Sequence, residues 1–202
     1  MRGVFLLADI SGYTAFLQAV ANAHGEQMAA MQEVPAAYPL MTSLLDGIVE
    51  RLVPPFRLCK LEGDAVFAYT SDDGFELRDG SVLACMKHCY AAYRERRDKT
   101  ENLMLCDCQA CSLLHKLDLK FVLHHGNCVV QSIAGHEEIV GPDVTMAHLL
   151  LKNTVTNRIG RAPYALLTES ATQYLEISLE GSVPHTEHYE HYPPIQSYVF
   201  TL

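Results

Sequence analysis

Two aspartates follow apolar, strand-like runs that lie far apart in the sequence. Asp9 closes the run 4–8, and Asp64 stands between the runs 56–61 and 65–69. A carboxylate at the end of a hydrophobic strand is costly to desolvate unless a cation pairs with it. Two such carboxylates brought together from different strands offer the oxygen ligands that Mg²⁺ prefers. These residues therefore predict a site for a divalent cation.

The residues around the two aspartates suit a bound phosphate. Gly12 and Gly63 allow the backbone to pass close to a bound group. Ser11 or Thr14 can cap a helix that begins just after the first strand. Its N-terminus would direct backbone N–H groups and the positive end of the helix dipole toward the site. The alternative is that the first aspartate is only a helix cap and the second only a turn residue.

Three segments resemble the motifs of class III nucleotide cyclases. Residues 5–14, FLLADISGYT, are similar to the first metal motif, F-x-D-I-x-G-F-T, and residues 60–65, KLEGDA, to the second, K-x-x-G-D. Residues 141–150, GPDVTMAHLL, fall where that family has G-x-x-V-N-x-A-A-R-L. An uncharacterised bacterial branch with this fold is similar in two further strings, CDCQAC at 106–111 and AHLLLKN at 147–153. The resemblance keeps the family's order of motifs and covers nearly the whole chain.

The resemblance implies a role for each matching residue. Asp9 and Asp64 would hold two Mg²⁺ or Mn²⁺ ions on a nucleoside triphosphate, with the Ile10 carbonyl completing the shell. Lys60 would read adenine, and Glu138 lies near the family's second base-reading position. The metals would activate the ribose 3′-hydroxyl for attack on the α-phosphorus, which converts ATP into cyclic AMP and pyrophosphate. The alternative for Lys60 is a solvated lysine at a strand end.

In that family the site forms between two subunits of a head-to-tail dimer, so the resemblance also implies a homodimer. A function of another class stays open at this point. The chain could be a catalytically silent nucleotide- or metal-binding module that regulates a partner.

Two departures from the family pattern bear on catalysis. Thr145 stands where the family has the Asn that orients the ribose, and Leu149 where it has the Arg that stabilises the transition state. An apolar side chain cannot supply that electrostatic stabilisation, whose loss typically costs roughly 10²–10³ in rate. Thr145, His148 and Lys152 share one helix face at i, i+3 and i+7 and are candidate replacements. A solvated polar stripe is the alternative.

A second cluster contains Cys106, Cys108 and Cys111, followed by His115. Three thiolates and an imidazole suit tetrahedral Zn²⁺, but the spacing is not that of the common zinc fingers. Free or redox-active thiols are the equal alternative. A zinc or thiol sensor would be compatible with either nucleotide function.

Two groups of histidines carry weaker signals. His124 and His125 lie at a strand end, where alternation sends the two rings to opposite faces. At most one of them could then approach a nucleotide. His185, His188 and His191 recur at three-residue intervals between two prolines, which favours a loop or hairpin with exposed histidines.

Composition predicts a single soluble domain over residues 1–202. The chain is 49% hydrophobic and 19% charged, enough to bury one sizeable core. A formal net charge of −9 argues against a nucleic-acid surface. No segment reaches the roughly 18 consecutive apolar residues of a membrane span, and the run 4–8 is too short for a signal-peptide core. Seven cysteines without an export signal indicate reduced thiols in the cytoplasm.

Periodicity and turn residues predict an alternation of helices and antiparallel strand pairs. We expect a break over 33–39 and a hairpin of strands 117–125 and 128–133 around Gly126-Asn127. The fold class is α+β, a ferredoxin-like sandwich of the class III cyclase type with helices packed on an antiparallel sheet. The full set of expected elements is strands at 4–9, 56–61, 65–70, 117–125, 128–133, 164–168 and 197–201, and helices at 13–31, 40–52, 79–98 and 144–152.

Overall fold

A mixed sheet carries the fold of the protein. The computed structural model describes residues 1–29, 34–73, 81–103, 108 and 110–202. Within these residues seven strands form one sheet in the order β2-β3-β1-β4-β7-β9-β8. Neighbouring strands are antiparallel except β4 and β7, which are parallel. The strands are β1 (Arg2–Ser11), β2 (Arg57–Glu62), β3 (Ala65–Ser71), β4 (Asp118–Asn127), β7 (Tyr164–Thr168), β8 (Val183–Glu187) and β9 (Ile195–Thr201).

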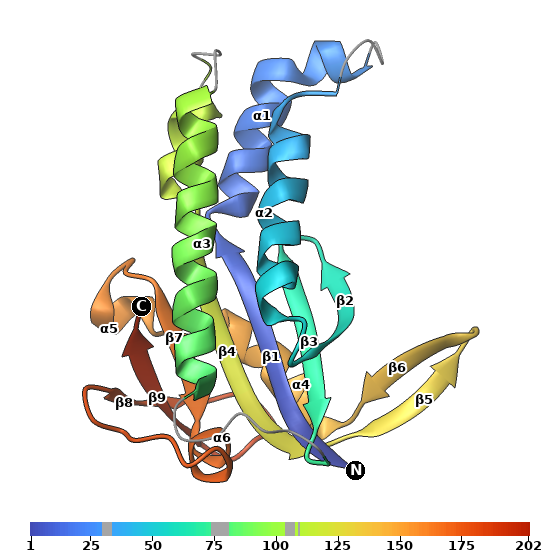
Figure 1. Cartoon of the computed structure of the whole chain (residues 1–202), viewed down its shortest axis with the longest axis vertical. Coiled ribbons are helices and arrows are strands. Elements are labelled where there is room, and N and C mark those ends of the chain that lie inside the picture. Colours follow the sequence, from blue (N-terminus) through green and yellow to red (C-terminus); the bar gives the residue numbers. More distant parts are fainter. Residues whose placement is uncertain (30–33, 74–80, 104–107, 109) are drawn as a thin grey trace.

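Helices cover both faces of this sheet. Three long helices, α1 (Tyr13–Ala29), α2 (Ala37–Leu52) and α3 (Ser81–Leu103), stand side by side on one face (Figure 1). The short helix α6 (Glu169–Tyr174) packs into the same core. The opposite face is covered by α4 (Pro142–Leu149), the 3₁₀ helix η2 (Leu150–Lys152) and α5 (Thr156–Ile159). A further 3₁₀ helix, η1 (Cys111–Lys116), leads into β4.

The central strand β1 is apolar on both sides because both faces of the sheet are covered. Successive side chains alternate between the faces. Leu6 and Ala8 pack against the three long helices, whereas Phe5 and Leu7 pack on the α4 side. Asp9 follows Phe5 and Leu7 in this alternation, so its carboxylate lies on the α4 side of the sheet, at the end of the strand.

The expected hairpin of strands 117–125 and 128–133 is wrong. Strand β4 pairs with β1 along its whole length and with β7 over Lys120–Leu123, so both of its sides already have a neighbouring strand in the sheet. The segment after β4 instead forms β5 (Val129–Ile133), which pairs with β6 (His136–Val140) in a separate two-stranded hairpin. Figure 1 shows this hairpin extending away from the main sheet.

Other differences concern the ends of elements. Helix α2 begins at Ala37, inside the expected break, because Pro39 falls in its first turn, where proline is tolerated. Helix α3 continues to Leu103, and the helix expected over 144–152 begins at Pro142 and becomes 3₁₀ after Leu149. Strands β6 and β8 and helices α5 and α6 were not predicted. In the described residues, no helix combines the length and apolar character that crossing a membrane requires.

Candidate functional site

The structure brings Asp9 and Asp64 to the same end of the sheet. Asp9 pairs in register with Ala65, the residue after Asp64. The backbone N–H of Ile10 donates to the Asp64 carbonyl at 3.2 Å. The pKa of Asp64 is raised by burial and by the nearby negative charge of Asp9. The two carboxylates are therefore within electrostatic reach of each other.

A lysine that the sequence reasoning missed lies between these groups and the rest of the sheet. Lys120 on β4 is the other register partner of Asp9. Its Nζ lies 2.9 Å from Oδ2 of Asp9, with the two side chains 19% and 16% exposed. The same ammonium donates to the Leu151 carbonyl at 2.8 Å. The sequence feature that could have identified Lys120 is that it is the one lysine within the strand-like run 117–125.

The three charged side chains fit a divalent cation. Two carboxylates and one ammonium leave one negative charge among them, and carboxylate oxygens are the ligands of hard cations. Asp9, Asp64 and the Ile10 carbonyl are the groups that would hold Mg²⁺. Among the described residues no three His, Cys, Asp or Glu side chains could by themselves hold a metal ion. That is compatible with Mg²⁺, which is usually bound by one or two carboxylates together with waters and substrate phosphates.

The chain turns sharply between β1 and α1 beside this site. Gly12 has a φ of +88°, and a Cβ there would lie 3.0 Å from the Lys116 carbonyl. The positive φ and the close approach of the Lys116 carbonyl both favour glycine at position 12. The Gly12 carbonyl accepts the Phe16 N–H at 3.0 Å and so begins α1. Burial and the charge of Asp64 raise the pKa of Tyr13 in the first turn. Gly63 has a φ of +66° in the β2–β3 turn.

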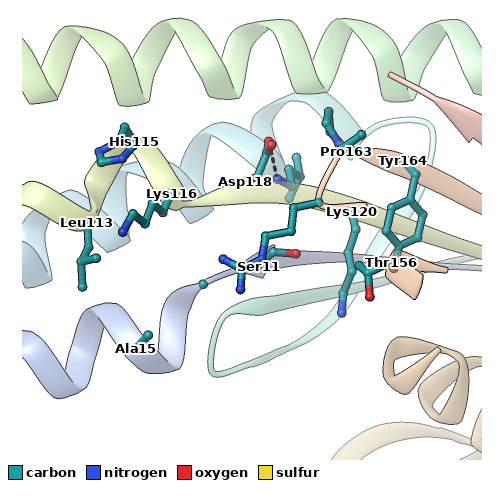
Figure 2. Close-up of a pocket in the computed structure, with 14 residues that line it drawn as sticks. Ser11, Ala15, Leu113, His115, Lys116, Asp118, Lys120, Thr156, Pro163 and Tyr164 are labelled. Carbon is teal, nitrogen blue, oxygen red and sulfur yellow. Dashed lines mark hydrogen bonds between the residues drawn. The ribbon is translucent and has the colours of Figure 1, made fainter. Parts of the chain in front are cut away.

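A cavity of about 510 Å³ opens next to Lys120 and the start of α1. Figure 2 shows Lys116 on the side of Leu113 and His115, and Lys120 on the side of Tyr164. Among its lining residues the cationic groups outnumber the acids, which favours an anionic ligand. The charged lining residues are Lys116, Asp118, Lys120 and Arg161, and the imidazole of His115 lies beside them.

The residues expected to read a base also come together. The Nζ of Lys60 lies 2.9 Å from Oε1 of Glu62 and 4.0 Å from Oε2 of Glu138. The hydrogen bond to Glu62 raises the pKa of Lys60. The other oxygen of Glu62 lies 3.1 Å from Nδ1 of His148. A polar chain thus runs from β6 across β2 to α4.

Of the three candidate replacements, Thr145 and His148 lie on α4, whereas Lys152 lies on η2. The hydroxyl of Thr145 donates to a carbonyl of the preceding turn at 3.2 Å. Burial lowers the pKa of His148, so its ring is neutral at pH 7. Lys152 is exposed and lies in the 3₁₀ helix, where the 3.6-residue periodicity no longer holds. Leu149 itself is half-buried.

The cysteine cluster has a different histidine partner from the expected one. Cys106 lies outside the described residues. The sulfurs of Cys108 and Cys111 are 3.5 Å apart, and Nε2 of His24 on α1 lies 3.3 Å from the Cys108 sulfur. His115 instead lines the cavity.

Three further histidines, His124, His125 and His185, have structural partners, whereas His188 and His191 are exposed as expected. His124 packs near Phe5 on the α4 side, whereas His125 stacks on Tyr174 of α6 with ring centroids 3.8 Å apart. The prediction of opposite faces is therefore confirmed. His185 is buried in β8 and pairs with Glu187 at 2.6 Å, so it is not an exposed loop histidine.

Sequence comparison assigns the chain to a family. Residues 41–158 match the family described as "Protein of unknown function (DUF2652)". The chain belongs to this family. It is 30% identical over 153 residues to the "Uncharacterized protein Rv2561/Rv2562" of Mycobacterium tuberculosis, over 74% of this chain and 68% of that protein.

Solved structures of cyclases share the fold of this DUF2652 protein. The adenylyl cyclase CyaB from P. aeruginosa superposes with a TM-score of 0.65 at 13% identity, over 98% of this chain and 94% of that one. The guanylyl cyclase Cya2 gives 0.64 at 13% identity, over 98% and 91%. The guanylate cyclase domain of RhGC from Catenaria anguillulae, solved in complex with GTP, gives 0.55 at 12% identity, over 98% and 94%. The predicted α+β fold of class III cyclases is therefore confirmed.

Proposed function

We propose that this protein binds a purine nucleoside triphosphate, with ATP the first candidate, together with Mg²⁺ or Mn²⁺. The observation that carries the proposal is the meeting of Asp9 and Asp64 beside Lys120. The carboxylates offer oxygen ligands to the cation, and the ammonium offers a positive charge to a phosphate. When bound, the cation would lower the charge of the triphosphate.

The cavity supports an anionic ligand next to the carboxylates. Ser11 and Gly12 line it at the start of α1, where free backbone N–H groups favour phosphate. Lys116 and Arg161 also line it, and within the described part of the chain neither forms a salt bridge. These cations are available to a ligand that carries several negative charges.

The Lys60–Glu138 pair supports a purine base. An ammonium donor and a carboxylate acceptor 4.0 Å apart offer complementary partners to the donor and acceptor atoms on a purine edge. Both side chains are more than a third exposed. They can therefore reach a base that is presented by another molecule of the chain.

We further propose that the site assembles in a homodimer. Large apolar side chains on β2 and on the β5–β6 hairpin are between 38% and 54% exposed. Exposed apolar groups of this kind mark protein interfaces when they gather on neighbouring elements. They are Leu58, Leu61, Val129, Val130 and Ile133.

Binding is better supported than turnover. At the position where charge must be stabilised in the transition state the chain has Leu149, and the neighbouring His148 is neutral at pH 7 because burial lowers its pKa. The absence of one such group typically costs roughly 10²–10³ in rate. We therefore propose a regulatory nucleotide-binding module, with slow conversion of ATP to cyclic AMP as the second candidate, favoured by the complete carboxylate pair.

One experiment tests the proposal and separates the two candidates. The purified chain is dialysed to equilibrium against each of ATP, GTP, CTP and UTP with Mg²⁺ or Mn²⁺, and products are resolved by mass spectrometry. We expect metal-dependent binding of ATP or GTP that is lost in Asp9→Asn and kept in Asp46→Asn, which alters an exposed acid on α2. A cyclic product that disappears in Asp9→Asn would establish the enzyme. Equal binding by wild type and Asp9→Asn would overturn the site.

A further inference from the structure

Two cysteines and a histidine from distant parts of the chain meet above the sheet. Cys108 and Cys111 have the C-x-x-C spacing, and their sulfurs are 3.5 Å apart. His24 on α1 places Nε2 3.3 Å from the Cys108 sulfur. All three side chains are half-buried, so a small reagent can reach them. We propose that Cys108 and Cys111 form a reversible disulfide by thiol–disulfide exchange, with His24 as the base for Cys108.

The distance between the sulfurs suits this reaction. A disulfide has an S–S length of about 2.05 Å, so the two sulfurs need to approach by about 1.5 Å, which is within the reach of side-chain rotation. C-x-x-C pairs are the common arrangement of redox-active dithiols. An imidazole within hydrogen-bond distance can accept the thiol proton and so generate the reactive thiolate.

The other described cysteines lack these features. Burial raises the pKa of Cys89 and of Cys59 to about 12, and it also raises the pKa of Cys85 and Cys128. Thiols whose pKa is raised react slowly at pH 7, because the thiolate is the reactive form. Among the described cysteines, reaction is therefore expected to be selective for the pair at 108 and 111.

The exchange needs an oxidant of the disulfide class, such as oxidised glutathione. The Cys108 thiolate, its proton transferred to Nε2 of His24, attacks one sulfur of the oxidant and forms a mixed disulfide while one thiolate leaves. The Cys111 thiolate then attacks the Cys108 sulfur and releases the second thiolate. The protein loses two electrons and two protons, and the oxidant becomes two thiols.

The position of the pair ties it to the candidate site. Helix η1 begins at Cys111, and three of its residues, Leu113, His115 and Lys116, line the cavity. Ala15 in the first turn of α1, the helix that carries His24, lines the same cavity. Oxidation would alter the contact between Cys108 and His24, which joins Cys108 to α1.

The test uses the full chain in glutathione buffers of graded ratio at pH 7. After rapid alkylation, peptide mass mapping identifies the linked cysteines and the rate at which they link. We expect a Cys108–Cys111 link that reverses with reduced glutathione, forms at the same rate in Cys85→Ser, and forms about tenfold more slowly in His24→Gln. Mapping of the wild-type chain needs no variant, so misfolding of a mutant cannot obscure the result.

Three outcomes would overturn the proposal. The first is that both thiols stay reduced at every glutathione ratio. The second is linkage that maps to other cysteines. The third is one tightly bound zinc ion per chain, measured by metal analysis of the protein as purified, that blocks both thiols, because the cluster would then be a metal centre.

Discussion

Asp9 on β1 and Lys120 on β4 are cross-strand partners whose side chains form an ion pair, with Nζ 2.9 Å from Oδ2. Both side chains are mostly buried, so the pair is less screened by water than a surface pair. The ammonium also donates to the Leu151 carbonyl at 2.8 Å. Lys120 thereby links the Asp9 carboxylate to the segment that follows α4.

Replacing Lys120 with Met should weaken both stability and binding. The change leaves the Asp9 carboxylate partly buried without its cation, so we expect the free energy of unfolding to fall by about 1–3 kcal/mol. We expect the affinity for ATP with Mg²⁺ to fall about tenfold, because a charge-assisted contact to phosphate is lost. Urea unfolding and equilibrium dialysis measure the two effects. The matched control is Lys87→Met, which removes an exposed lysine on α3. Equal affinities of the Lys120 variant and the wild type would refute a role in phosphate binding.

Replacing Asp64 with Asn should stabilise the protein in the absence of metal. Burial and the charge of Asp9 raise the pKa of Asp64, so its ionised form is disfavoured in the fold and stability rises as pH falls through that raised pKa. At pH 7 the neutral amide should therefore add a few tenths to about 1 kcal/mol. Thermal unfolding should also show that Mn²⁺ with ATP raises the Tm of the wild type but not of the variant. The matched control is Asp46→Asn, and an unchanged metal response in Asp64→Asn would contradict the assignment.

Acid should destabilise the protein through His124. Burial lowers the pKa of this imidazole to about 4, below its ordinary 6.5. The unfolded chain therefore binds a proton at a higher pH than the folded chain, and stability falls as pH drops from about 6.5 to about 4. We expect a loss on the order of 2 kcal/mol from this group. Urea unfolding at pH 7, 5.5 and 4.5 should show a flatter dependence for His124→Asn.

The control for this pH dependence is His191→Asn, since the His191 side chain is 84% exposed. That variant should keep the wild-type pH profile. If His124→Asn and the wild type lose the same free energy on acidification, another group is responsible.

Charges on the β5–β6 hairpin should weaken self-association. Glutamates in place of Val129 and Ile133 would have to be desolvated in an apolar interface. We expect the dissociation constant of the dimer to be at least about tenfold higher for the double variant than for the wild type. Sedimentation equilibrium measures this. Leu179→Glu alters an apolar residue of similar exposure, 41%, that lies outside the hairpin, and it should leave association unchanged.

The sequence signals were strongest where one local segment contains the whole feature. The run 4–8 followed by Asp9 predicts a buried strand that ends in a carboxylate, and β1 has this form. The turn around Gly63 predicts the β2–β3 hairpin, which the structure contains. The Gly126-Asn127 turn was misleading because the hairpin rule does not account for β1 and β7, which occupy both edges of β4.

The amino-acid sequence by itself determined the alternation of strands and helices, the position of Asp9 and Asp64 at strand ends, and the apolar character of Leu149, because each depends on residues that are neighbours along the chain. Only the tertiary structure decided that Lys120 pairs with Asp9 and that His24, not His115, contacts Cys108. Those contacts depend on the register between strands and on how α1 is placed relative to Cys108. Register and packing are set by the burial of the whole core, and no local pattern specifies them.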